Sequence, residues 1–236
     1  MGGGCMFQGK MKAVTCSYDD GVTQDIRFIA LLDRYGLKAT FNLNSRLLGL
    51  PGELVRNGVK VNHNKISPAD CKAIYAGHEV AVHTLTHPNL TTLSTSDIVY
   101  QVEQDRLRLS ELVGYEVVGM AYPCGGVNND ERVADIIKNH TGVQYARTIT
   151  TTESFDQSTN LYRFNPTVYH IDMDDMFALA ERFLSSQPTT PQVFYIWGHS
   201  YELDAWNLWG KMETFMQYIA GKEDVFYGTN REILLS

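Results

Sequence analysis

The stretch Cys16-Ser17-Tyr18-Asp19-Asp20-Gly21 follows the apolar run Ala13-Val14-Thr15 and places two adjacent carboxylates and a glycine at the end of an expected strand. Asp-Gly is the strongest short signal for a hairpin turn. A hairpin needs a second strand after the glycine, but here apolar residues recur at helical spacing, as Ile26, Ile29, Leu32 and Tyr35. The stretch therefore joins a strand to a helix, and Gly36 is placed to end that helix.

The rest of the chain repeats this alternation. Apolar runs predict strands at 12–18, 38–44, 78–83, 117–122, 145–149, 192–197 and 225–227. Helical patterns occupy 26–35, 95–113, 130–140, 174–186 and 205–220, with a short helix after Ser67-Pro68. Residues 45–66 are polar and irregular, which indicates a turn or a small hairpin insert. Strands separated by helix-length crossovers favour a parallel sheet, and their number favours a closed or nearly closed barrel of the α/β class.

The composition is that of one globular domain. The chain has 236 residues, of which 44% are hydrophobic and 20% charged, and its net charge is -7. No basic patch suggests nucleic-acid binding, and no apolar stretch is long enough to cross a membrane. We expect a flexible leader at 1–10 and a single folded domain at 11–236. The leader has no signal-peptide pattern and the four cysteines show no paired spacing, so we expect a reducing, cytoplasmic location.

Four polar clusters follow expected strands: Asp19-Asp20-Gly21, residues 83–87, residues 123–126 and residues 198–200. In a barrel of parallel strands, functional residues collect on the loops at the carboxyl ends of the strands. We therefore expect these four clusters to form one site.

The first two clusters have the chemistry of a metal site. His83 and His87 are separated by three residues and precede Pro88, which places them in a loop rather than on the helix of an HExxH protease. Taken alone, they are better explained as a surface pair. Two histidines and one carboxylate would make a three-ligand set that leaves positions open for water and substrate. The second carboxylate would then lie close enough to feel the cation.

The other two clusters offer further reactive groups. His199 ends the strand at 192–197 and belongs to the same rim. Cys124 invites a role as a nucleophile, but no histidine or aspartate neighbours it in sequence, so we favour a role for its backbone N–H.

Together, S-Y-D-D-G, H-T-L-T-H, A-Y-P-C-G and Y-I-W-G-H-S resemble, in order, the motifs of the polysaccharide deacetylase family (NodB homology, carbohydrate esterase family 4). The resemblance implies a distorted (β/α) barrel and a divalent metal, usually zinc and sometimes cobalt. It implies that Asp20, His83 and His87 bind the metal and that Asp19 is the general base. His199 would be the general acid, and the backbone N–H of Cys124 would stabilise the oxyanion.

The sequence departs from the family pattern at two points. The third motif of the family often begins with an arginine that orients the base, whereas this chain has Ala121. We hypothesise that Arg147 supplies this charge from another strand, with Arg163 as the alternative. The carboxylate that orients the acid histidine also has no clear counterpart, and the candidates are Asp172, Asp174 and Asp204. Aromatic residues that could form a sugar platform are Tyr122, Tyr169, Trp197, Tyr201 and Trp206.

The resemblance predicts a metal-dependent hydrolase that removes acetyl groups from an N-acetylated sugar, oligosaccharide or polysaccharide, such as chitin or peptidoglycan. One alternative is hydrolysis of a small non-sugar amide on the same fold. Another is a carbohydrate-binding domain without catalysis. The expected partner is thus an N-acetylated carbohydrate, with neither nucleic acid nor membrane, and the sequence sets no oligomeric state.

Overall fold

The structure is a computed structural model that describes residues 6–236. Its strands are β1 Lys12–Asp19, β2 Ala39–Leu43, β3 Glu53–Arg56, β4 Val59–Asn62, β5 Glu79–Val82, β6 Gly119–Ala121, β7 Tyr145–Arg147, β8 Val168–Tyr169, β9 Gln192–Gly198 and β10 Val225–Tyr227. Its α-helices are α1 Asp25–Tyr35, α2 Cys71–Ile74, α3 Thr95–Val113, α4 Glu131–His140, α5 Met173–Ser185, α6 Glu202–Ala205, α7 Trp209–Ile219 and α8 Asn230–Leu234.

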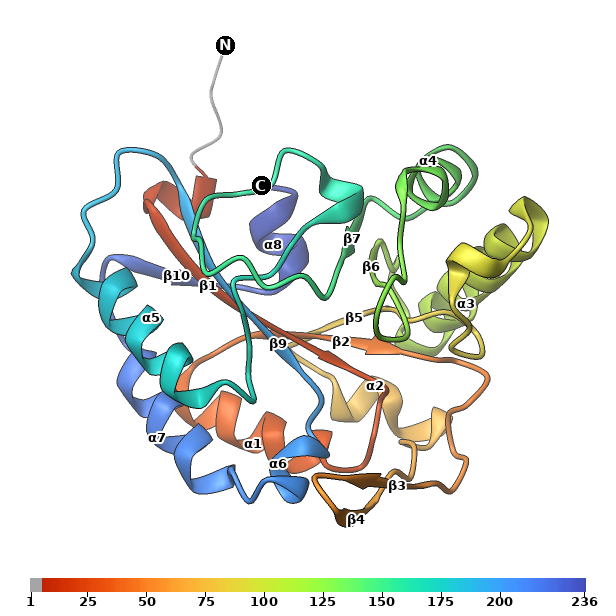
Figure 1. Ribbon diagram of the computed structural model, residues 1–236, viewed down its shortest axis with the longest axis horizontal. Helices are drawn as coiled ribbons and strands as arrows, with labels where there is room; N and C mark the ends of the chain where they lie inside the picture. Colours follow the sequence, from red (N-terminus) through yellow and green to blue (C-terminus); the bar gives the residue numbers. More distant parts are fainter. Residues whose placement is uncertain (1–5) are drawn as a thin grey trace.

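A parallel sheet in the order β7-β6-β5-β2-β1-β9-β8 forms the centre of the molecule (Figure 1). Strand β1 lies in the middle and is buried along its whole length. Its first half pairs with β10, where Lys12 faces Val225, and its second half pairs with β2, where Asp19 faces Asn42. Because all these strands run in the same direction, their carboxyl ends meet at one end of the sheet.

The sheet curls until its two edges, β7 and β8, are connected by a short segment. Phe164 makes a parallel bridge with Arg147 of β7, and a few residues later Val168 and Tyr169 pair with β9. The barrel is therefore distorted, since a single chain segment rather than a continuous ladder joins the two edges. The α/β barrel-like fold predicted from the alternating pattern is confirmed.

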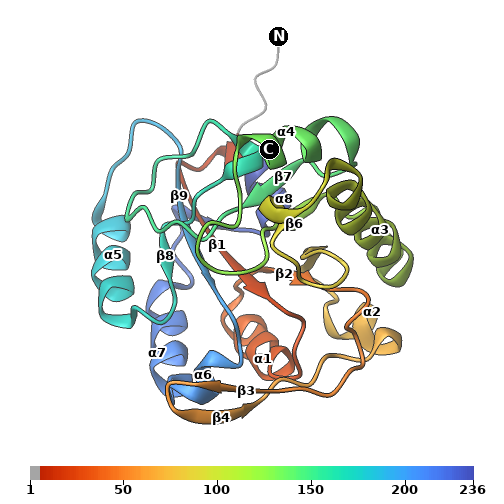
Figure 2. The ribbon, with the colours of Figure 1, turned by 45° about the vertical axis from the view of Figure 1, so that its right-hand side comes forward.

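Helices cover the outside of the sheet in two groups. Helices α1, α5 and α7 lie together on one side, and α3 and α4 lie together on the other (Figures 1 and 2). Helix α1 shows why a helix packs on the sheet. Its apolar face buries Phe28 and Leu32, and it ends at Gly36, whose φ of 68° is readily adopted by a residue without a Cβ.

The irregular segment before α2 contains the predicted hairpin. Strands β3 and β4 are joined by Asn57 and Gly58, both at positive φ, as a type I′ turn requires. The hairpin lies beside α6 at the lower edge of Figure 2. The chain after it runs against the turn that follows β1, since the Ile66 N–H donates to the Gly21 carbonyl. This pairing brings the insert to the carboxyl end of β1.

The structure differs from the sequence expectations in some elements. The helix expected at 205–220 begins only at Trp209, as α7, because the short helix α6 ends at Ala205 and the chain turns at Asn207, which has φ of 52°. Of the predicted leader, residues 1–5 lie outside the described part, but residues 6–10 pack on the domain, where Phe7 is buried and stacks on Phe226. Helix α8 was not expected. Among the described residues, no helix combines the length and apolarity needed to cross a membrane.

Candidate active site

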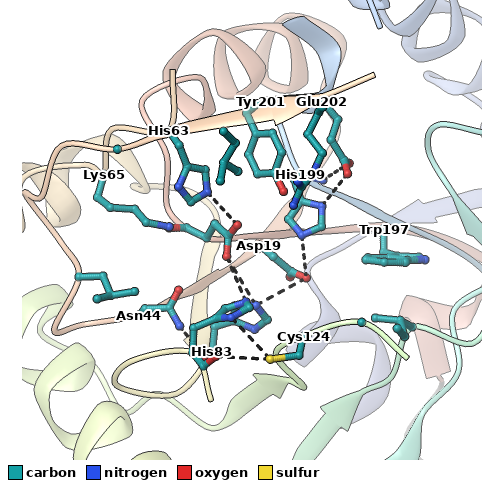
Figure 3. A pocket seen from close by; sticks show the side chains of 18 of the residues that line it. Asp19, Asn44, His63, Lys65, His83, Cys124, Trp197, His199, Tyr201 and Glu202 are labelled. Atoms are coloured by element: carbon teal, nitrogen blue, oxygen red, sulfur yellow. Dashed lines mark hydrogen bonds and ion pairs between the residues drawn. The ribbon is translucent and has the colours of Figure 1, made fainter. Parts of the chain in front are cut away.

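The four polar clusters meet in one cavity of about 570 Å³ at the carboxyl end of the sheet (Figure 3). Its lining includes all of the strand-end residues singled out in the sequence, which are Asp19, Asp20, His83, His87, Cys124 and His199. The position rule for parallel barrels thus places these side chains correctly.

Asp20, His83 and His87 form a compact group of metal-ligating atoms. Oδ1 of Asp20 lies 3.7 Å from Nε2 of His83 and 3.6 Å from Nε2 of His87. Nδ1 of His83 lies 2.9 Å from the Ala121 carbonyl, to which it donates, so its Nε2 lone pair faces the carboxylate. One oxygen and two imidazole nitrogens within 4.8 Å of one another match the donor set that zinc takes in catalytic sites.

The backbone that presents these ligands is unusual. Asp20 has φ of 85° and His87 has φ of 64°, both in the left-handed region that costs energy for a residue with a Cβ. Hydrogen bonds from other segments hold this backbone, since Nζ of Lys65 donates to the Asp20 carbonyl. The Thr84 hydroxyl accepts the N–H of His87, and the Asn44 amide donates to the carbonyls of His83 and Thr84. The loop is therefore fixed by side-chain hydrogen bonds before any ligand binds.

The electrostatics favour the protonation states that a metal requires. Burial raises the pKa of Asp20, but the His63 hydrogen bond and the Lys65 charge outweigh it and hold that pKa well below its usual range. Burial lowers the pKa of His83 to about 4. An ionised carboxylate and a neutral imidazole are the ligating forms of these groups.

Asp19 is held by two donors from other strands. Nη2 of Arg147 lies 2.6 Å from Oδ2, and the Asn42 amide donates to Oδ1 at 2.8 Å. Arg147 is fully buried, and its guanidinium lies over the Trp197 ring. Arg163, the alternative, instead contacts Asn129 and Glu131. The structure therefore brings Arg147, and not Arg163, to Asp19.

His199 lies across the cavity from the metal-ligating group. Its Nε2 is 3.9 Å from Oδ2 of Asp19, and its Nδ1 is 3.1 Å from Oε1 of Glu202. Burial lowers the pKa of His199, but the adjacent Glu202 carboxylate outweighs this and raises it to about 9. Glu202 also accepts from Nε2 of His170 at 2.8 Å, and Nδ1 of His170 lies 2.8 Å from the Tyr18 hydroxyl. His199 is thus supported by a buried network.

Glu202 corrects the sequence analysis. The predicted partners of His199 were wrong: Asp172 and Asp174 are exposed, and Asp204 accepts from Gln24 and Trp209. The signal that could have found Glu202 is its spacing, three residues after His199 at the start of a helix, where the two side chains meet.

Cys124 lies in the cavity lining with a left-handed φ of 71°. Its Sγ is 3.8 Å from Nδ1 of His87. Burial and the Asp20 charge raise the pKa of the thiol, which disfavours the thiolate that a nucleophile needs. The role predicted for its backbone N–H stays a prediction.

The sequence analysis missed two residues of the insert, His63 and Lys65. Nε2 of His63 lies 3.0 Å from Oδ2 of Asp20, and Nζ of Lys65 donates to the Asp20 carbonyl at 2.8 Å. No local pattern marks them, because they lie in a segment without periodicity after the β3–β4 hairpin, 43 and 45 residues after Asp20.

Most of the predicted aromatic platform lines the cavity. Tyr169 and Trp197 stack with ring centroids 4.4 Å apart, and Tyr122 and Tyr201 also face the cavity. Trp206 is the exception, since it packs on the small apolar cluster of Val22, Val61 and Tyr201 behind the hairpin.

The sequence of the chain is similar to those of known proteins. A sequence model described as polysaccharide deacetylase matches residues 8–146, more than half of the chain. The chain belongs to the polysaccharide deacetylase family. The resemblance to this family of hydrolases, which act on N-acetyl amide bonds, is thereby confirmed. The match includes the first three motifs, and the fourth, at 195–200, lies beyond it.

Curated relatives match part of the chain. The peptidoglycan-N-acetylglucosamine deacetylase PgdA of Listeria monocytogenes serotype 1/2a (strain 10403S) is 28% identical over 120 residues. The match covers 50% of this chain and 22% of that protein, so the chain spans about a fifth of the length of the curated relatives it matches. The PgdA proteins of two further strains match equally.

Solved structures show the same fold at low identity. The family 4 carbohydrate esterase from Streptomyces lividans, solved with acetate, is 15% identical with a TM-score of 0.54, covering 92% of this chain and 91% of that chain. The Xyl-CE4 domain of a xylanase from the hindgut metagenome of Trinervitermes trinervoides is 18% identical with a TM-score of 0.56, covering 96% and 90%. A family 4 pseudoenzyme from Bacillus anthracis is 20% identical with a TM-score of 0.52, covering 95% and 65%.

Proposed function

We propose that this protein is a metal-dependent deacetylase that hydrolyses the acetamido group of an N-acetylated sugar within a glycan. One observation carries the proposal. Oδ2 of Asp19 lies 3.9 Å both from Nε2 of His83, in the metal-ligating group, and from Nε2 of His199. A carboxylate, a metal-ligating group and a charged imidazole therefore face one another within a single cavity.

Asp20, His83 and His87 are the residues that would hold the ion. When bound, a divalent metal such as zinc would polarise the acetyl carbonyl and make a water molecule more acidic. Zinc is our first candidate because the set contains two imidazoles, with cobalt as the alternative.

Asp19 is suited to accept the proton of the attacking water. Its Oδ1 is engaged by Asn42 and its Oδ2 by Arg147, so the carboxylate cannot rotate freely. Oδ2 also faces the two imidazoles across the cavity. We infer that Arg147 replaces, from β7, the arginine absent at Ala121. A fixed carboxylate in this position meets the geometric requirement for a general base.

His199 is suited to donate the proton that the leaving amine requires. Glu202 raises the pKa of His199 to about 9, so the imidazole carries its proton at neutral pH. The C–N bond then breaks with that proton on the nitrogen, which yields acetate and a free amine. We assign the oxyanion formed on the way to the backbone N–H of Cys124, which lies in the cavity lining.

The substrate is proposed from the cavity walls and from the relatives. Three aromatic side chains line the cavity, and of these Tyr169 is partly exposed and offers ring surface of the kind that packs against sugars, whereas Trp197 and Tyr201 are largely buried behind it. The curated relatives are named for N-acetylglucosamine in peptidoglycan. We therefore place N-acetylglucosamine-containing oligosaccharides first among the substrates to test.

The test compares Asp19→Asn with Asp20→Asn in zinc binding and in acetate release from chitooligosaccharides and peptidoglycan fragments. We expect Asp19→Asn to bind about one zinc per chain yet lose turnover by about 10²–10⁴-fold, as for other general bases. Asp20→Asn should lose both zinc and turnover. If the two variants behave alike, the division of roles between these aspartates is wrong.

The same assay separates the alternatives. If the parent protein binds glycans but releases no acetate with zinc or cobalt, it is a carbohydrate-binding domain without catalysis. A protein of the same fold from Bacillus anthracis is described as a pseudoenzyme. Acetate release only from small acetylated amines would favour the non-sugar amide hydrolase.

A further inference from the structure

The β3–β4 hairpin brings a third imidazole, that of His63, to the metal-ligating group of Asp20, His83 and His87. His63 follows the hairpin, and its ring enters the cavity apart from that of His83 (Figure 3), with Nε2 within hydrogen-bond distance of Oδ2 of Asp20. It is 16% exposed, so it forms part of the cavity wall rather than the core.

The two oxygens of Asp20 have different partners. Oδ1 lies 3.7 and 3.6 Å from the Nε2 atoms of His83 and His87, whereas Oδ2 lies 3.0 Å from Nε2 of His63. Only the His63 distance is that of a hydrogen bond. One oxygen is therefore left for a metal, while the other is held by an N–H donor.

His63 is itself fixed by the backbone around it. Its N–H donates to the Gly52 carbonyl at 2.9 Å, and the Gly52 N–H donates to Oδ1 of Asn64. A Cβ on Gly52 would lie 2.8 Å from the His63 carbonyl oxygen, so this approach requires glycine. The His63 ring also packs edge-on against Tyr201, with centroids 5.0 Å apart. Its position is set before any ion binds.

We propose that His63 is a positioning residue of the metal centre, which holds Oδ2 of Asp20 so that the ion is bound through Oδ1 alone. The proposal rests on the metal site of the proposed function, and it assigns to the hairpin insert control of metal affinity. Outer-shell partners of this kind typically change metal affinity by about 10–100-fold.

The experiment measures zinc affinity without substrate, by competition with a chelator, in the parent, His63→Ala and His63→Gln. We expect His63→Ala to bind zinc about 10–100-fold more weakly. His63→Gln keeps an N–H donor and should recover part of that loss. Thermal unfolding of the metal-free variants checks that each is folded.

A matched control is available in His78, whose Nε2 lies 3.1 Å from Oδ1 of Asp33, outside the cavity lining. His78→Gln should leave zinc affinity unchanged. Unchanged affinity in folded His63→Ala overturns the proposal. An equal loss of zinc affinity in His78→Gln also overturns it, because the loss in His63→Ala would then reflect general destabilisation of the protein.

Cobalt substitution separates positioning from ligation. If His63 only positions Asp20, the visible absorption of the cobalt protein should keep its coordination signature in His63→Gln. A change to a different coordination number would make His63 a ligand and overturn the positioning role. A parent that binds zinc but releases no acetate would defeat the proposed function alone, and a parent that binds no divalent ion would defeat both.

Discussion

The cavity has two halves that are built differently. The half proposed for proton transfer contains Asp19 and His199, and its supports, Arg147 and Glu202, are buried charged groups. The half proposed for metal binding contains Asp20, His83 and His87, and its outer support is His63, a partly exposed imidazole on an insert. Removing one partner of a buried ion pair leaves an uncompensated charge, whereas removing an outer hydrogen bond does not. Variants in the first half should therefore lower both turnover and the free energy of unfolding. Variants in the second half should lower turnover through a weaker affinity for the metal.

The largest effect should come from Arg147→Met, which leaves Asp19 buried without its cation. We expect a loss of about 3–5 kcal/mol in the free energy of unfolding, measured by urea denaturation. Turnover should also fall, at most as far as in Asp19→Asn because the carboxylate itself remains, while zinc affinity stays near that of the parent.

The double variant Arg147→Met with Asp19→Asn removes both charges and is the control. It should recover most of the stability but none of the turnover, since replacing both partners of a buried pair is far less costly than removing one. A fully stable and active Arg147→Met would contradict the coupling of Asp19 to Arg147.

An intermediate effect is expected for Glu202→Gln, which removes the charge that raises the pKa of His199 to about 9. A general acid works while protonated, so turnover should fall as the pH rises through that pKa. In the variant this alkaline limb should move to lower pH by about one unit or more. The measurement is kcat against pH, with zinc affinity as the control that should stay constant.

The same shift has a consequence for stability. Because the folded pKa of His199 is raised, its contribution is fully present below the unfolded pKa of about 6.5 and is lost as the pH rises through about 9. The difference in the free energy of unfolding between the parent and Glu202→Gln should therefore become smaller as the pH rises between these values. An alkaline limb that does not move in Glu202→Gln would show that His199 is not the acid.

The smallest effect should come from the outward face of the same hairpin. Nζ of Lys60 lies 2.6 Å from Oε1 of Glu53, and both side chains are exposed. Lys60→Ala should change the free energy of unfolding by about 0.2–1 kcal/mol at most and leave zinc affinity and turnover unchanged. A loss of zinc in this variant would mean that the hairpin as a whole, rather than His63, sets the affinity.

The residues that touch the reacting atoms in the proposed mechanism could be predicted because they lie at strand ends. The buried run before Asp19 and the helical spacing after Gly21 are local features, and they place Asp19 and Asp20 at the carboxyl end of β1. The same reasoning places His83 and His199. Parallel strands bring these ends together, so a one-dimensional pattern is enough to assemble them.

The residues that hold these groups were harder to predict. Arg147 was one of two hypotheses, and it lies 128 residues from Asp19 in the chain. His63 lies in a segment without periodicity, and Glu202 was overlooked in favour of three aspartates that the fold directs elsewhere. Which charged side chain reaches a given carboxylate depends on how the sheet curls and where loops cross, and no local spacing encodes either.

By itself, the sequence determined the alternation of strands and helices, the strand-end motifs and thereby the family. These follow from burial, turn chemistry and helical periodicity, which act over a few residues. Tertiary structure alone decided that Arg147 meets Asp19, that Glu202 meets His199 and that a hairpin insert holds Asp20 through His63. Those contacts join segments far apart in the chain or depend on side-chain direction at a helix start. These contacts therefore depend on how the core packs, and local sequence patterns do not predict them.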